Sequence, residues 1–137
     1  MFHVINDLER IGDHALNLLE KTELFVDKGL IYSDSAKEEI QTIYERNLLL
    51  YDRAFGAFLR NDLTEEEEKE LHALEDSIDK LTLQSQDNHV DRLRAKQCHT
   101  EPGIVFAKAL HDLERIGDHS YNIAWAAKKD TPAVRQI

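Results

Sequence analysis

The chain has 137 residues, and its 27 Asp and Glu outnumber its 17 Lys and Arg, which gives a formal net charge of −10. The length fits one domain with a core large enough to fold unaided, and the low content of Gly and Pro is typical of a helical protein. The excess of acid excludes nucleic acid as a partner, because phosphate contacts need clustered Lys and Arg, and no apolar run approaches the ~18 residues of a membrane span.

The first two helices are predicted from apolar periodicity and from residues typical of helix ends. Apolar residues recur at a 3–4 spacing over about residues 2–28, and Gly29 follows as a C-terminal cap. A capping box formed by Ser35 and Glu38 predicts the start of the second helix, and Asn61 closes it. The apolar seam predicted for the first helix contains Ile5, Leu8, Ile11, Ala15, Leu18 and Leu19.

The third helix is predicted to begin at a second capping box, Thr64 with Glu67, and to run to about residue 97. Pro102 marks the first turn of the fourth helix, where proline is tolerated, and apolar positions continue to Ala127. Short connections between long helices favour antiparallel neighbours. The predicted fold class is therefore all-α, an antiparallel up-down helical bundle.

An internal repeat is the strongest signal in the sequence. The octapeptide DLERIGDH occupies residues 7–14 and recurs at residues 112–119, and Asn17 is matched by Asn122. Eight consecutive identities indicate a duplication in which each unit holds about three helices. The first helix then corresponds to the last helix of an earlier unit, so we expect the chain to be a fragment. The alternative is a natural domain with a shortened first helix.

Each copy of the octapeptide places a Glu and an Asp four residues apart on one helix face. Such carboxylates repel one another unless a cation lies between them. One interpretation is that Arg10 and Arg115 supply that charge from one turn away. Gly12 and Gly117 favour a second interpretation, because a mid-helix glycine costs about 1 kcal/mol relative to alanine and so indicates close approach of a neighbouring backbone or a bound group. The four acids are Glu9 with Asp13, and Glu114 with Asp118.

The third helix carries a matching pair, Glu75 and Asp79, each of which follows an apolar seam residue. Counting residues outward from the third connection places this pair within about one turn of the pair on the fourth helix, at roughly 1.5 Å per residue. The two pairs could form a four-carboxylate cluster, with His72 and His111 as additional imidazoles. Oxygen ligands suit Mg, Ca, Mn or iron. His14 and His119 are expected to be hydrogen-bonded structural residues, and from spacing alone metal binding and its absence both stay open.

The octapeptide followed by x-x-Asn resembles the signature of the PhoU family. The resemblance implies two three-helix repeats, with residues 1–29 as the last helix of a truncated repeat, 35–129 as a complete repeat and 130–137 as a C-terminal tail. It also implies divalent or trivalent metal ions as cofactors, namely iron, Mn, Mg or Zn. The implied ligands are Glu75, Asp79, Glu114 and Asp118, together with the motif acids Glu9 and Asp13 of the truncated repeat.

The resemblance further implies a non-enzymatic regulator of phosphate transport and homeostasis. The segment from Pro102 to Phe106 lacks the Asp-Leu-Arg of stand-alone PhoU proteins, which favours the C-terminal PhoU-like region of a bacterial sodium/phosphate cotransporter. That role places the domain in the cytoplasm at the inner face of the plasma membrane, with the transporter as partner and a homodimer as a further option. The alternatives are a stand-alone PhoU, a di-metal enzyme in a helical bundle, or a purely structural bundle.

Overall fold

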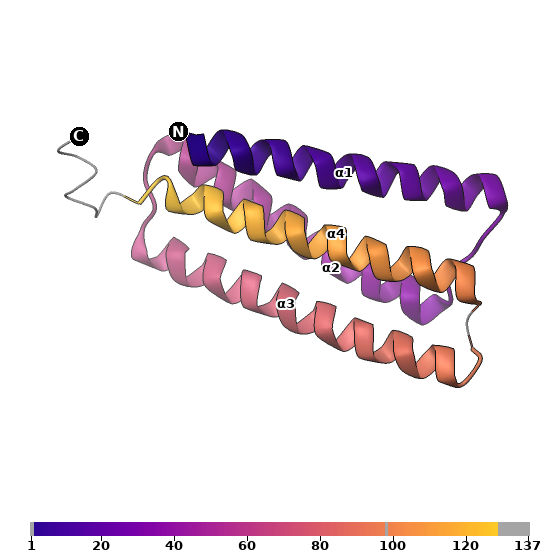
Figure 1. Ribbon diagram of the computed structural model, residues 1–137. Coiled ribbons are helices and arrows are strands. Elements are labelled where there is room, and N and C mark those ends of the chain that lie inside the picture. Colours follow the sequence, from indigo (N-terminus) through magenta and orange to yellow (C-terminus); the bar gives the residue numbers. More distant parts are fainter. Residues whose placement is uncertain (1, 98, 129–137) are drawn as a thin grey trace.

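The structure is a computed structural model that describes residues 2–97 and 99–128 (Figure 1). The tail expected at 130–137 lies outside the described residues. Four helices follow one another, and α1 spans Phe2–Lys28, α2 Asp34–Arg60, α3 Glu65–Arg94 and α4 Thr100–Trp125. The predicted all-α fold is confirmed. None of the described helices is long and apolar enough to cross a membrane.

Most of the predicted helix ends are confirmed, and two differ from the prediction. The Oγ1 of Thr64 accepts the backbone N–H of Glu67 and caps α3, as predicted, whereas α2 is capped by Ser33 and not by Ser35. Ser33 has the extended backbone of an N-cap, and its Oγ accepts the N–H of Ala36 at 3.3 Å. The third helix ends at Arg94, before the predicted residue 97.

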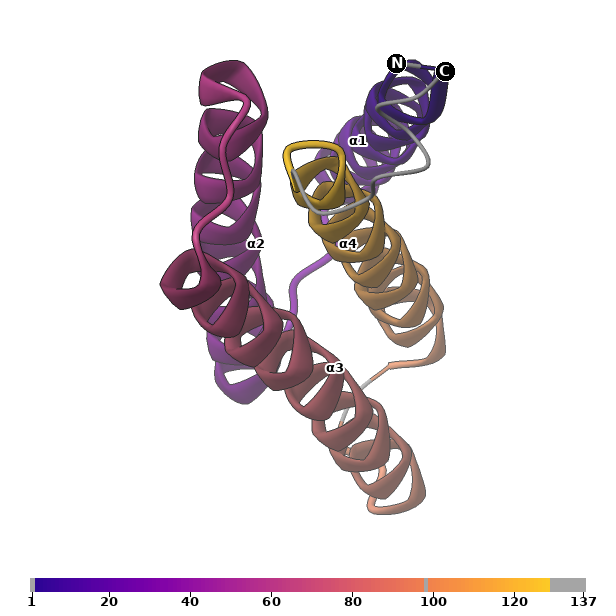
Figure 2. The ribbon, with the colours of Figure 1, turned by 90° about the vertical axis from the view of Figure 1, so that its left-hand side faces the viewer.

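The fourth helix lies at the centre of the molecule. It packs against α1, α2 and α3, and α2 also packs against α3, so that α1 approaches α4 alone among the described helices. Figures 1 and 2 show that α4 runs antiparallel to both α1 and α3 and is flanked by α1 on one side and by α2 and α3 on the other. Side chains on one side of α4 can therefore face α1, and those on the other side can face α2 and α3.

The core lies where α2, α3 and α4 meet. Its largest fully buried members come from all three helices, and they follow the predicted seams. They include Ile43 and Leu50 of α2, Leu71 and Ile78 of α3, and Phe106 and Leu110 of α4. Burying a side chain of this size contributes about 1.5–3 kcal/mol, so these contacts fix how α3 faces α4.

The seam predicted for α1 is only partly buried. Leu8, Ile11 and Leu18 are half-buried against α4, whereas Ile5 and Leu19 are 53 % and 55 % exposed. The prediction of a core position is wrong for these two residues and for Ala15, which is also exposed within the described chain. The physical reason is that α1 packs against one helix, α4, among the four that the structure describes, and α4 covers only a narrow stripe of its apolar face.

Candidate metal centre

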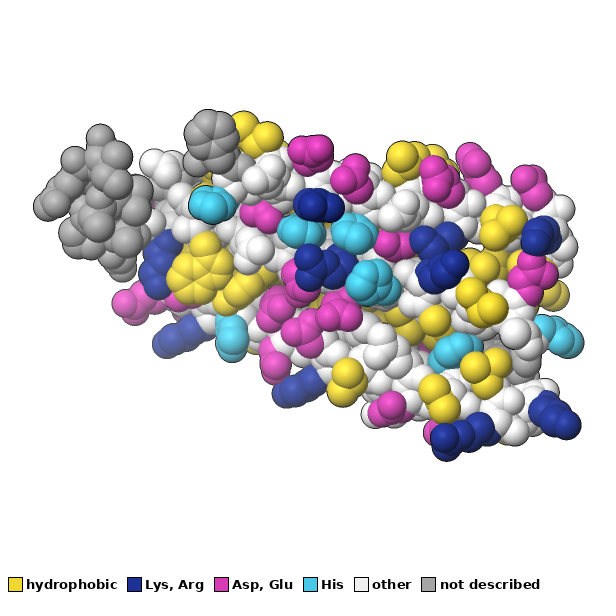
Figure 3. Space-filling view, in the orientation of Figure 1, with side chains coloured by type: hydrophobic (Ala, Val, Ile, Leu, Met, Phe, Trp, Pro, Cys, Tyr) yellow, Lys and Arg dark blue, Asp and Glu magenta, His cyan; other side chains and the backbone are white. Residues whose placement is uncertain are grey.

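Helices α3 and α4 bring acidic side chains together at the edge of the core. Glu75 and Asp79 lie one turn apart on α3, and Asp118 projects from α4. One carboxylate oxygen from each of the three lies within 4.8 Å of the others, and all three side chains are half-buried. Figure 3 shows acidic side chains gathered at the junction of α3 and α4. The predicted facing of the two helices thus places three acids in one group.

The fourth predicted acid lies beside this group. Glu114 is half-buried, and its pKa is raised first by burial and then by the negative charges of Asp118 and Asp79. It is outside the group of three whose oxygens converge within 4.8 Å. The expected imidazoles are also outside that group, and the Nδ1 of His72 lies 3.3 Å from the Tyr121 hydroxyl.

Burial and the closeness of these carboxylates raise the pKa of two of them, Glu75 and Asp79. Partial burial, followed by the charges of Asp79 and Asp118, raises the pKa of Glu75 to about 7. Burial and the charge of Asp118 also raise the pKa of Asp79. Like charges that are taken out of water must bind protons or a cation. At neutral pH the binding of a proton or a metal cation by this group is therefore favourable.

A pH dependence of stability follows for the metal-free protein. The pKa of Glu75 is higher in the folded state, so its contribution is fully present below pH ~4.5 and is lost as the pH rises through about 7. Burial lowers the pKa of His89, so the contribution of His89 to stability increases as the pH rises and opposes that of Glu75. The pH dependence of wild type therefore does not isolate the contribution of Glu75. In the presence of a chelator, circular dichroism should show Glu75→Gln melting at a higher temperature than wild type at pH 8 and at the same temperature as wild type at pH 4. The same difference in melting temperature between variant and wild type at both pH values would contradict this expectation.

Gly117 allows α4 to approach α2 beside the acidic group. A Cβ at this position would lie 2.8 Å from the Oδ1 of Asn47, a buried α2 residue. A Cβ at Gly12 would meet nothing within 4 Å in the described structure. The close approach expected at both glycines is therefore observed at Gly117 only, and the approaching group is a side chain.

The two copies of the octapeptide meet at the α1–α4 seam. The Nδ1 of His14 lies 2.8 Å from the Oδ1 of Asp112, and the Nδ1 of His119 lies 2.9 Å from the Oδ1 of Asp7. The two imidazole rings stack with centroids 6.2 Å apart. Because each Asp pairs with the His of the other copy, an approximate two-fold axis relates the copies.

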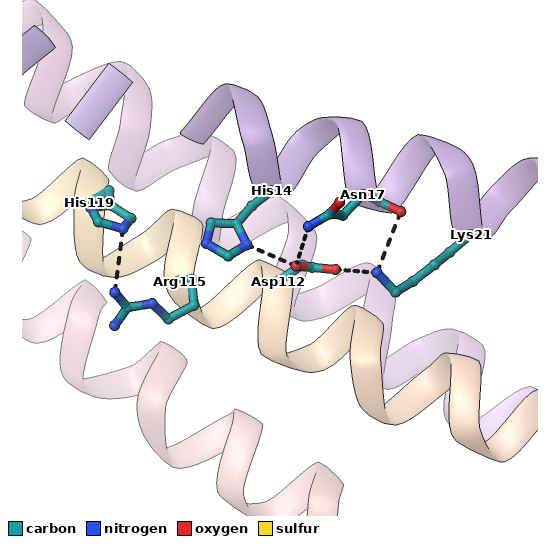
Figure 4. Close-up of polar contacts among 6 residues, drawn as sticks. All are labelled: His14, Asn17, Lys21, Asp112, Arg115 and His119. Atoms are coloured by element: carbon teal, nitrogen blue, oxygen red, sulfur yellow. Dashed lines mark hydrogen bonds and ion pairs between the residues drawn. The ribbon is translucent and has the colours of Figure 1, made fainter. Parts of the chain in front are cut away.

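Asp112 is the more heavily bonded of the two aspartates. It is 3 % exposed, and it accepts from Lys21 at 2.6 Å and from Asn17 at 3.5 Å in addition to His14 (Figure 4). Burial by itself would raise the pKa of Asp112, but the hydrogen bonds from Lys21 and His14 outweigh it and hold that pKa below its usual range. This carboxylate stays ionised and fastens α1 to α4.

The motif acids of α1 are not brought into a cluster. Glu9 and Asp13 are exposed, and the one acidic group of metal-binding type found among the described residues does not contain them. The expected structural role of His14 and His119 is confirmed by their hydrogen bonds, but their partners were missed. The signal was present, because Asp and His lie two turns apart in each copy and therefore oppose each other when identical motifs run antiparallel.

Comparison with known proteins gives a clear family match. Residues 40–127, which include most of α2 and all of α3 and α4, match the PhoU domain family. The chain belongs to the PhoU domain family. The chain is 33% identical over 118 residues, 86% of its length, to the phosphate-specific transport system accessory protein PhoU homolog 1 of Thermotoga maritima, and these residues cover 49% of that protein.

A second relative of the PhoU domain is an uncharacterized protein of Deinococcus radiodurans. The two are 25% identical over 125 residues, which is 90% of this chain and 44% of the relative. The chain thus spans about half the length of both relatives. No solved structure matches it.

Proposed function

We propose that this PhoU domain is a metal-binding regulatory domain of phosphate uptake that has no catalytic turnover of its own. The observation that carries the proposal is the convergence of Glu75, Asp79 and Asp118 within 4.8 Å. The raised pKa of Glu75 supports it, because the same crowding of charge that favours a proton favours a metal ion. Glu114 lies close enough to interact with both Asp79 and Asp118 and would complete the ligand set.

The chemistry of these ligands defines the class of ion. Carboxylate oxygens are hard ligands that suit Mg, Mn and iron, and zinc also accepts them. When bound, a divalent or trivalent ion supplies positive charge that favours the ionised forms of Glu75 and Asp79, whose pKa values are raised without it. Because the acids come from two helices, the ion would pin α3 to α4 and stabilise the folded state by mass action.

The regulatory role is supported by the name of the Thermotoga maritima relative, an accessory protein of a phosphate-specific transport system. That name fits a stand-alone regulator at least as well as the cotransporter context that the sequence favoured. In either arrangement, the domain would act on a membrane phosphate transporter from the cytoplasm, at the inner face of the plasma membrane.

We also propose that α1 is the last helix of a second PhoU-like repeat. The approximate two-fold axis at the α1–α4 seam relates α1 to α4, and α4 is covered by α2 and α3. Equivalent positions differ sharply in burial: Ile5 is 53 % exposed, whereas its counterpart Leu110 is fully buried. The outer face of α1 therefore matches a face that binds a helical hairpin.

Metal analysis of matched double variants tests the proposed function. After dialysis against Mn²⁺ or Fe²⁺, wild type should retain the ion, and Glu114→Gln combined with Asp118→Asn should lose most of it. The equivalent change in the first copy of the motif, Glu9→Gln with Asp13→Asn, is the control and should retain the ion, because these acids are exposed and face no acidic partner. Equal metal content in all three proteins would refute the centre.

A further inference from the structure

A single arginine connects the acidic group to the α1–α4 seam. The Nη1 of Arg115 donates to the Oδ2 of Asp118 at 3.3 Å, and the Nη2 lies 3.5 Å from the Nε2 of His119. The second of these contacts is visible in Figure 4, where the guanidinium and the imidazole face each other along α4. Burial and the charge of Asp118 raise the pKa of Glu114, and the charge of Arg115 partly offsets that rise, so Arg115 acts on two of the four acids.

The other nitrogen of the same imidazole faces α1. The Nδ1 of His119 lies 2.9 Å from the carboxylate of Asp7, which is 8 % exposed. With the proton on Nδ1 donated to Asp7, the Nε2 is free to accept from Arg115. A series of hydrogen bonds therefore runs from Asp7 on α1 through His119 and Arg115 to Asp118, which belongs to the acidic group.

The first copy of the motif lacks this series of hydrogen bonds among the described residues. Arg10 is exposed, and among the described residues it forms no ion pair with Asp13 and no hydrogen bond with His14. The contact of Arg115 with Asp118 is therefore not an automatic product of the repeated sequence. It occurs in the copy whose aspartate, Asp118, lies in one group with two acids of α3.

We propose that Arg115 is the built-in counter-ion of the acidic group and competes with metal for Asp118. This inference rests on the metal-binding function proposed above. A metal ion bound at the Oδ2 of Asp118 would displace the guanidinium from that oxygen, and an ion bound at the Oδ1 would still be repelled by the charge of Arg115. His119, held by Asp7, is the positioning residue that keeps Arg115 at the site, so α1 sets how readily the ion enters.

Matched glutamine variants in the full chain test the competition. Mn²⁺ alone is titrated into wild type, Arg115→Gln and Arg10→Gln, and free Mn²⁺ is followed by electron paramagnetic resonance. Arg115→Gln should bind Mn²⁺ roughly tenfold more tightly, because one partly screened positive charge near the ion is removed. Arg10→Gln removes the same charge at the equivalent position and should stay within about twofold of wild type.

The positioning role is tested in the same assay with His119→Gln and its equivalent His14→Gln. His119→Gln should tighten binding by less than Arg115→Gln does, and it should add nothing when combined with Arg115→Gln, since both act through one group. His14→Gln loosens the same seam without touching Arg115 and should leave the affinity unchanged.

The outcomes separate this inference from the proposed function. If wild type binds no Mn²⁺, the metal centre itself is wrong. If wild type binds Mn²⁺ and Arg115→Gln binds it equally or more weakly, or if both arginine variants gain equally, the centre stands and the competition is refuted. Equal effects of the two histidine variants, or additive gains in the His119→Gln and Arg115→Gln double variant, would refute the positioning role.

Discussion

Replacing Asp112 with alanine is expected to lower the free energy of unfolding by about 2–3 kcal/mol. The carboxylate is 3 % exposed and accepts from three α1 side chains, among them His14 and Lys21. Without the carboxylate, those donors lose their hydrogen-bond partner at a site that is largely shielded from water. The loss falls below the range for fully buried pairs because the Lys21 side chain is 19 % exposed and can still reach water.

Asp7→Ala is the matched control at the equivalent position. Asp7 accepts from His119 alone among the described residues, so its removal should cost about 1 kcal/mol. Urea denaturation measures both variants. Hydrogen exchange should show the faster opening in Asp112→Ala concentrated in α1, because α4 is the one described helix against which α1 packs. Equal losses in the two variants would mean that the extra donors on Asp112 contribute nothing.

The two motif glycines should respond to alanine in opposite directions. Gly12→Ala is expected to stabilise the protein by about 0.5–1 kcal/mol, since a mid-helix alanine is favoured and nothing lies within 4 Å of the new Cβ. Gly117→Ala should destabilise it by about 1 kcal/mol, because the overpacking cost exceeds the same helical gain. The Cβ would sit 2.8 Å from the Oδ1 of Asn47, which is 3 % exposed and whose Nδ2 is bonded to the Ile43 carbonyl.

A double-mutant cycle separates this clash from any other effect at Gly117. In an Asn47→Ala background the crowding oxygen is gone, so Gly117→Ala should become neutral or stabilising there. Thermal unfolding of the four proteins gives the coupling free energy. If Gly117→Ala destabilises the Asn47→Ala background as much as wild type, then Asn47 is not what requires the glycine.

The helices could be predicted because their signals are local. Apolar spacing, the Thr64 cap and Pro102 in the first turn act within a few residues, and they place α3 and α4 within a few residues of their observed bounds. The error at the start of α2 is also local, since Ser33 and Ser35 both offer a hydroxyl and only the extended backbone of Ser33 lets it cap. Local rules choose between such neighbours poorly.

The candidate site was predictable in part. The shared four-residue spacing of the acids on two adjacent helices was enough to expect them to face each other, and Glu75, Asp79 and Asp118 do converge. The position of Glu114 beside that group was not predictable. Which side chains of a facing set converge depends on the rotation of each helix about its own axis, and spacing fixes that rotation only to within part of a turn.

The sequence by itself determined the four helices, the duplication and the acids that could share a face, because each of these is written in spacing along one chain. The tertiary structure decided what the two identical octapeptides do. One copy lies against α2 and α3, so Gly117 meets Asn47 and Asp118 meets acids of α3, while the other copy leaves Gly12 and Asp13 exposed. Identical residues acquire different roles because pKa, packing and hydrogen bonding depend on neighbours that only the folded arrangement supplies.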